Sequence, residues 1–193
     1  MQSVCVFCGS SKGKNPKFVE AAKLLGRYLA ELNIKLIYGG GKIGLMGVLA
    51  DSCMANGGHV IGVIPKFLSG KEIAHEGVTE LIAVDSMHQR KLKMSELAEG
   101  FIALPGGYGT LEEFMEILTW VQLSLVTKPV GILNVDGFYD HLIHQFKTMA
   151  EQQLLKRSNL DFFVQADNVK DLLKQFEDLS IRLVKIRDKF IDT

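Results

Sequence analysis

Residues 100–113 read GFIALPGGYGTLEE, and this stretch decides the fold that the sequence predicts. It opens with a short apolar run over 100–104, which is typical of a buried β-strand. Three glycines within 106–109 follow, and they allow a tight turn with the backbone close to a ligand. Residues 108–125 then favour a helix. A strand joined to a helix by a glycine-rich turn is the repeating unit of an α/β sheet, so we expect such a sheet here.

The same alternation of short apolar runs and longer amphipathic periods continues along the chain. It predicts an α/β, Rossmann-like, doubly wound parallel sheet with helices on both faces, formed by a single domain over 1–193. The polar stretch 67–78 is expected to form a mobile loop over the site. We expect strands at 2–7, 34–38, 59–64, 80–84, 100–104 and 129–134. We expect helices at 16–32, 44–57, 87–98, 108–125, 137–152, 167–178 and 179–190.

The charge balance argues for a small ligand. Lys and Arg together number 22, as do Asp and Glu, whereas a nucleic-acid-binding protein normally presents a basic face. No apolar run reaches the roughly 18 residues that a membrane span needs, and no signal peptide precedes the strand-like run at 4–7. We therefore expect a cytoplasmic protein with neither nucleic-acid nor membrane partners.

Cys5 and Cys8 stand in a C-x-x-C spacing that could be half of a zinc site or a redox pair. A zinc site needs about four ligands, and no second Cys or His pair has metal-binding spacing. Cys5 also falls inside a predicted strand, where a thiol packs like a small apolar group. We therefore predict structural cysteines and no bound metal, and the odd total of three fits a reducing compartment.

Two more glycine-rich turns follow predicted strands, at 8–11 and 39–44. The second contains G-x-G-x-x-G, but 60–65 lacks the acidic residue that a dinucleotide site places about 20 residues further on. The turn at 39–44 is also not a Walker A loop, because Ile43 follows Lys42 where that loop has Ser or Thr. Ligands of open α/β sheets bind beyond the carboxyl ends of the strands, so we expect the chemistry at these strand-to-helix turns.

The turn at 105–110 has the features of an anion cradle. Gly106 and Gly107 leave backbone N–H groups free at a helix start, where the helix dipole favours a phosphate, and Thr110 adds a hydroxyl. The position of the turn alone is equally consistent with a glycine-rich connection between strand and helix that binds nothing. Glu112 and Glu113 favour the functional interpretation, because two carboxylates beside a phosphate are unfavourable unless one is catalytic. Adjacent helical residues point about 100° apart, so only one should face the ligand.

A basic cluster, MHQRK at 87–91, begins another predicted helix. Cations favour the opposite end of a helix, so Arg90 and Lys91 at its start suggest a functional role, although a solvated basic turn stays open as an alternative. For His88, a capping or surface position is the simpler interpretation.

Together these motifs resemble the LONELY GUY (LOG) family of cytokinin riboside 5′-monophosphate phosphoribohydrolases. The resemblance is carried by GGGKIGLMG at 39–47, MHQRK at 87–91 and PGGYGTLEE at 105–113. It covers about residues 3–150, because it also includes VFCGSS at 6–11, KPVG at 128–131 and NVDG at 134–137.

The resemblance implies a Rossmann-like homodimer whose sites draw residues from both chains. It also implies hydrolysis of N6-substituted adenosine 5′-monophosphates to free base and ribose 5-phosphate, without a cofactor or metal. It assigns catalytic roles to Arg90 and Glu113. The residues that it implies in substrate binding are Glu72, Arg90, Lys91, Gly106, Gly107, Tyr108, Gly109, Thr110, Leu111, Glu112, Glu113 and Thr119.

Such proteins have often been labelled lysine decarboxylases. Decarboxylation through pyridoxal phosphate needs a Schiff-base lysine and a partner for the pyridinium nitrogen. No motif in this sequence supplies that pair, so we expect a different chemistry.

Cleavage of a C–N glycosidic bond builds positive charge on the ribose. Glu113 near C1′ would stabilise that charge and activate water, and Arg90 would hold the phosphate or ribose or keep Glu113 ionised. Two alternatives stay open: an enzyme for ordinary purine or pyrimidine 5′-monophosphates, and a nucleotide-binding protein without catalysis. The second has little use for an acid beside a bound anion.

Overall fold

The computed structural model describes residues 1–69 and 73–191, and within them seven strands form one parallel sheet in the order β4-β3-β2-β1-β5-β6-β7. Each neighbouring pair is parallel. The predicted fold class is therefore confirmed. The strands are β1 Ser3–Phe7, β2 Lys35–Tyr38, β3 Val60–Pro65, β4 Glu80–Val84, β5 Phe101–Ala103, β6 Val130–Leu133 and β7 Val164–Ala166.

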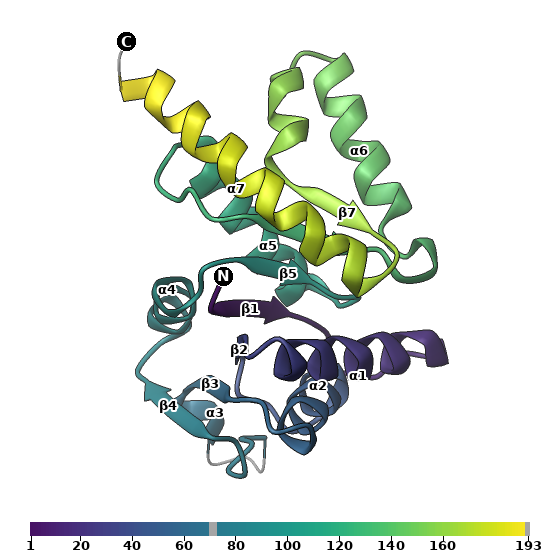
Figure 1. Ribbon diagram of the computed structural model, residues 1–193, viewed down its shortest axis with the longest axis vertical. Coiled ribbons are helices and arrows are strands. Elements are labelled where there is room, and N and C mark those ends of the chain that lie inside the picture. Colours follow the sequence, from purple (N-terminus) through teal and green to yellow (C-terminus); the bar gives the residue numbers. More distant parts are fainter. Residues whose placement is uncertain (70–72, 192–193) are drawn as a thin grey trace.

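Helices connect the strands through crossovers that cover both faces of the sheet (Figure 1). Right-handed crossovers place α1 and α2 on one face and α4, α5 and α6 on the other. The α-helices are α1 Pro16–Glu31, α2 Gly44–Ala55, α3 Lys66–Ser69, α4 Met87–Leu97, α5 Tyr108–Gln122, α6 Asp140–Glu151 and α7 Val169–Ile191, and the 3₁₀ helices are η1 Val135–Gly137 and η2 Arg157–Phe162. None of these helices combines the length and apolar character that a membrane crossing needs within the described residues.

Helix α1 illustrates why the sequence forms these elements. Its N-cap, Asn15, accepts a hydrogen bond from the backbone N–H of Lys17, and Pro16 occupies the first helical position. Leu25 and Leu29 recur at helical spacing and are fully buried against the sheet. The helix therefore begins where the sequence predicts and packs its apolar stripe into the core.

The strand order reverses at β1, which pairs with β2 on one side and β5 on the other. Val6 is in register with Tyr38, and Phe7 with Ala103. The turns that follow these three strands therefore leave the sheet next to one another, at its carboxyl edge. This is the topological switch point at which doubly wound sheets bind ligands.

The C-terminal region differs from the prediction. The two helices expected at 167–178 and 179–190 are one helix, α7, which runs past β7 toward the C-terminus (Figure 1). No Gly or Pro interrupts 169–191, and the residues that its inner face buries keep one helical spacing across the expected break: Leu172, Phe176, Leu179 and Leu183.

Four other short elements were not predicted, namely β7, α3, η1 and η2. Strand β7 has only three residues and no clear alternation, so its pairing with β6 defines it rather than its own sequence. The stretch 67–78, predicted as a loop, includes most of α3, and Ala74 forms an isolated antiparallel bridge with Gly41. Backbone pairing with residues distant in sequence produces β7 and the bridge at Ala74, whereas α3 is a single local turn of helix.

We expect Leu172→Ala to lower the free energy of unfolding by about 2–5 kcal/mol, because the fully buried side chain leaves a cavity between α7 and the sheet. Leu154→Ala is the matched control, since Leu154 is 84% exposed, and its change should stay within about 0.5 kcal/mol. Urea denaturation of both variants measures the difference. Equal losses would contradict the docking of α7 as an integral part of the core.

Candidate functional site

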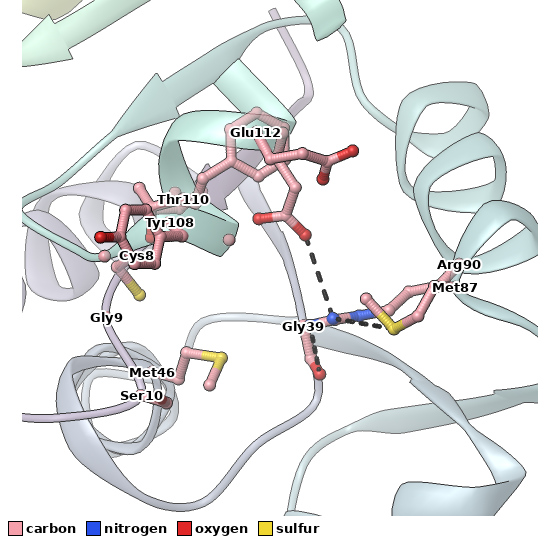
Figure 2. Close-up of a pocket in the computed structure, with 15 residues that line it drawn as sticks. Cys8, Gly9, Ser10, Gly39, Met46, Met87, Arg90, Tyr108, Thr110 and Glu112 are labelled. Atoms are coloured by element: carbon pink, nitrogen blue, oxygen red, sulfur yellow. Dashed lines mark hydrogen bonds and ion pairs between the residues drawn. The ribbon is translucent and has the colours of Figure 1, made fainter. Parts of the chain in front are cut away.

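A cavity of about 260 Å³ opens at the switch point, between the ends of β1 and β2 and the starts of α4 and α5 (Figure 2). All three predicted glycine-rich turns contribute to its wall. They supply residues 8–10 after β1, Gly39 after β2 and residues 107–110 at the start of α5. The lining residues are Val6, Phe7, Cys8, Gly9, Ser10, Gly39, Met46, Met87, Arg90, Gly107, Tyr108, Gly109, Thr110, Glu112 and Glu113.

Arg90 enters the cavity from the first turn of α4, which Ser86 caps by accepting a hydrogen bond from the N–H of Gln89. Its guanidinium donates from Nε to the carbonyl of Val63 at 3.1 Å and from Nη2 to the carbonyl of Gly39 at 3.0 Å. Figure 2 shows Arg90 reaching from α4 to Gly39 with Met87 beside it. Two backbone carbonyls thus fix the plane of the guanidinium, and Nη1 remains directed toward Glu113.

Glycine at position 39 is a steric requirement of this arrangement. A Cβ there would lie 1.8 Å from Arg90 Nη2 and 3.2 Å from the sulfur of Met46. The turn can therefore hold the guanidinium against its backbone only because the side chain is missing. This explains in local terms why glycine directly follows strand β2.

Glu113 is the buried carboxylate of the cavity, with 11% of its side chain exposed. Its Oε1 lies 4.0 Å from Arg90 Nη1. Burial raises the pKa of Glu113 from 4.5 to about 7, and although the charge of Arg90 opposes this shift, the desolvation of the carboxylate is the larger effect. A carboxyl group that titrates near neutrality inside a cavity is suited to proton transfer or to stabilising a cation.

The start of α5 supplies the features of an anion cradle. Gly107 occupies the N-cap and, lacking a side chain, leaves the first amide groups of the helix without an internal partner. Thr110, which is 4% exposed, lines the same space. Gly106 is required behind it, because a Cβ there would lie 2.1 Å from Thr110 Oγ1. The positive end of the helix dipole therefore faces the cavity with polar groups around it.

Lys91 joins α4 to α5. Its Nζ donates to the carboxylates of Glu112 and Glu116. Burial lowers the pKa of Lys91, but the hydrogen bonds and charges of the two carboxylates raise it by more, so the net shift is upward. The ion pairs position the two helix starts, and with them Arg90 and Glu113, relative to each other.

The structure gathers the larger part of the predicted site in the cavity, namely Arg90, Gly107, Tyr108, Gly109, Thr110, Glu112 and Glu113. Only one of the adjacent carboxylates was expected to face the ligand, and the two side chains do lie differently. Glu113 is buried inside, while Glu112, with 56% of its side chain exposed, lines the rim and pairs with Lys91.

Four predicted residues lie elsewhere. Gly106 borders a neighbouring hollow, Leu111 packs against the core, and Lys91 is held by its two carboxylates. Thr119 is exposed on α5 and donates to the carbonyl of Met115. Glu72 lies outside the described residues. Their roles in substrate binding stay predictions.

Eight lining residues were not assigned to the site from the sequence: Val6, Phe7, Cys8, Gly9, Ser10, Gly39, Met46 and Met87. They belong to motifs that the sequence does show, so the signal was present. What the motifs did not reveal is that parallel pairing brings residues 8–10, 39 and 46 to the same point.

The fold and the cavity define a class of protein: a Rossmann-like α/β protein whose cavity combines a glycine-rich helix start with a largely buried acid close to an arginine. A family model described as "Possible lysine decarboxylase" matches residues 46–176. Among the described residues, none of those lining the cavity is a lysine, so the cavity does not fit pyridoxal phosphate held as a Schiff base.

Individual relatives identify the family more specifically than the family model does. The chain is 46% identical over 188 residues to cytokinin riboside 5′-monophosphate phosphoribohydrolase LOG7 of Arabidopsis thaliana, covering 97% of this chain and 87% of that protein. It is 48% identical over 177 residues to LOG4 of the same plant, covering 92% and 82% respectively. It is 47% identical over 186 residues to the probable enzyme LOGL6 of Oryza sativa, covering 96% and 74%. The chain therefore belongs to the LOG family.

Solved structures support the same fold. The molybdenum cofactor carrier protein of Chlamydomonas reinhardtii superimposes with a TM-score of 0.68 at 18% identity, covering 93% of this chain and 98% of that one. The molybdenum cofactor binding protein of Rippkaea orientalis gives a TM-score of 0.64 at 22% identity, covering 95% and 94%. At these identities the likeness concerns the fold alone.

Burial of Glu113 makes stability depend on pH. Because its pKa is raised, the folded protein binds more protons than the unfolded chain between pH 4.5 and about 7, and stability falls as pH rises through this window. Glu113→Gln stays neutral, so its stability relative to wild type should increase by about 2–3 kcal/mol between pH 5 and pH 8. Urea denaturation at both pH values measures this. Glu76→Gln, at an exposed position, is the control, and parallel curves for wild type and Glu113→Gln would contradict the shift.

Proposed function

We propose that this protein hydrolyses the N-glycosidic bond of N6-substituted adenosine 5′-monophosphates and releases the free base and ribose 5-phosphate. The observation that carries the proposal is the placement of buried Glu113, 4.0 Å from Arg90, about one helical turn beyond the anion cradle at the start of α5. A nucleoside 5′-monophosphate has its phosphate and its glycosidic carbon at opposite ends of the ribose. The cavity offers a complementary group for each.

The substrate class rests on the relatives, whose names specify cytokinin riboside 5′-monophosphates. In the reaction, water adds its hydroxyl to C1′ as the C–N bond breaks, and the proton that water loses balances the one that the departing base gains. Positive charge develops on the ribose during this step. The carboxylate of Glu113 stabilises that charge and accepts a proton from the attacking water.

A pKa of about 7 suits Glu113 to this role, because a general base works best when its pKa lies near the working pH. Arg90 stays protonated throughout, so it acts as a fixed positive charge and hydrogen-bond donor rather than as an acid. Its Nη1, 3.8 Å from the sulfur of Met87 and 4.0 Å from Oε1 of Glu113, holds the ribose and favours the ionised form of Glu113.

The first experiment is chromatographic detection of free base from N6-isopentenyladenosine 5′-monophosphate, with the riboside and AMP in parallel. We expect release from the modified monophosphate and none from the riboside, which lacks the group that the α5 cradle binds. Glu113→Gln should lower kcat by at least about 100-fold, since it removes the charge that acts in the transition state, while nucleotide binding survives. Equal turnover of AMP would favour the ordinary nucleotide as substrate, and binding without release would favour a carrier.

We also propose that the protein is a homodimer through the outer stripe of α5. Tyr108, Met115 and Thr119 share this exposed side of the helix, and Leu92 on α4 is 53% exposed. Apolar side chains at helical spacing on a surface favour burial against a partner. Thr119, remote from the cavity of its own chain, then serves the cavity of the partner. The cytoplasmic location stays a prediction from the sequence.

Light scattering after size exclusion tests the dimer. Wild type should have twice the 21.4 kDa mass of the chain. Met115→Glu should give monomers, because it places a charge in the proposed interface, whereas Leu32→Glu, at an exposed position after α1, should remain dimeric. A dimeric Met115→Glu variant would place the interface elsewhere.

A further inference from the structure

The turn that holds Arg90 has little rigidity of its own. Gly39, Gly40 and Gly41 follow one another, and glycine has the largest conformational freedom of any residue. Gly40 also adopts a φ of +72°, which a side chain would disfavour. Yet the carbonyl of Gly39 must stay in place, because it is one of the two acceptors that fix the guanidinium of Arg90. A second part of the chain must therefore restrain this turn.

Residues 73–75, which we call the strap, lie across the turn and supply that restraint. The N–H of Lys42 donates to the carbonyl of Ile73 at 2.8 Å, and the N–H of His75 donates to the carbonyl of Gly40 at 2.8 Å. Ala74 completes the arrangement as the antiparallel bridge partner of Gly41. The strap thus pairs with the glycine turn through a single antiparallel bridge flanked by two backbone hydrogen bonds.

One side-chain contact secures the strap to the rest of the fold. Nε2 of His75 donates to Oδ1 of Asp51 at 2.9 Å, and the histidine side chain is only 14% exposed. Asp51 lies on α2, the helix that begins directly after the glycine turn. The contact therefore closes a ring that runs from the turn along α2, through Asp51 and His75, and back by the strap to the turn.

We propose that Asp51 and His75 are positioning residues for Arg90, acting through the strap and the carbonyl of Gly39. Neither residue lines the cavity, so neither contacts the substrate. The inference rests on the proposed function for its kinetic effect. The restraint of the glycine turn itself is independent of which substrate the protein uses.

Kinetics separate this role from a purely structural one. Asp51 has 65% of its side chain exposed, and a contact whose acceptor is well solvated contributes little to global stability. We expect His75→Ala to leave the unfolding temperature nearly unchanged and to lower kcat by about 10- to 100-fold, as a small displacement of a catalytic group does. KM should change little, because the α5 cradle is intact. His75→Gln, whose amide can reach Asp51, should recover most of the activity, and His59→Ala, at an exposed position, should match wild type.

Amide exchange measures the restraint directly. The N–H of Lys42 donates a hydrogen bond to the carbonyl of Ile73 in the strap. It should exchange faster in His75→Ala and in Asp51→Ala than in wild type. The double variant should match the single ones, because both changes break the same contact.

Unchanged kcat or unchanged Lys42 exchange in His75→Ala would overturn the proposal, as would additive effects in the double variant. If the wild-type protein releases no base from any nucleotide, the proposed function fails, whereas the exchange comparison still decides whether Asp51 and His75 hold the turn. Should His75→Ala not fold, His75→Gln and Asp51→Ala carry the same comparison.

Discussion

The parallel pairing of β1 with β2 on one side and β5 on the other is the constraint on which the cavity depends. Three glycine-rich turns, separated by dozens of residues in sequence, leave the sheet at this one point because parallel strands end at the same edge. The crossover helices then present their N-termini there, so backbone N–H groups and helix dipoles face a shared space. Without this pairing the turns would be three unrelated connections.

Inside the cavity, two opposing electrostatic effects determine the state of Glu113. Burial raises its pKa, and the charge of Arg90 at 4.0 Å lowers it, with burial prevailing. Arg90 cannot move closer without giving up the carbonyls of Gly39 and Val63. The backbone therefore sets the distance between the two charges, and that distance keeps the acid poised near neutrality instead of fully ionised.

Much of this could be predicted from the sequence, since its strongest signals are local. The turn at 105–110, the basic helix start at 87–91 and the strand β1 each depend on neighbours within one or two turns of chain. Strand β7 and the undivided α7 could not be predicted equally well. Three residues carry too little pattern to define a strand, and a charged surface obscured the continuous buried stripe of α7.

The sequence by itself determined the α/β alternation, the family and the identity of the acid and the arginine, because these reside in motifs whose residues are adjacent in the chain. Only the tertiary structure decided that Gly39 is a hydrogen-bond acceptor for Arg90, that Lys91 binds two carboxylates, and that His75 of the strap meets Asp51 of α2. These contacts join segments from different elements. Their geometry follows from strand order and helix packing, which no local pattern specifies.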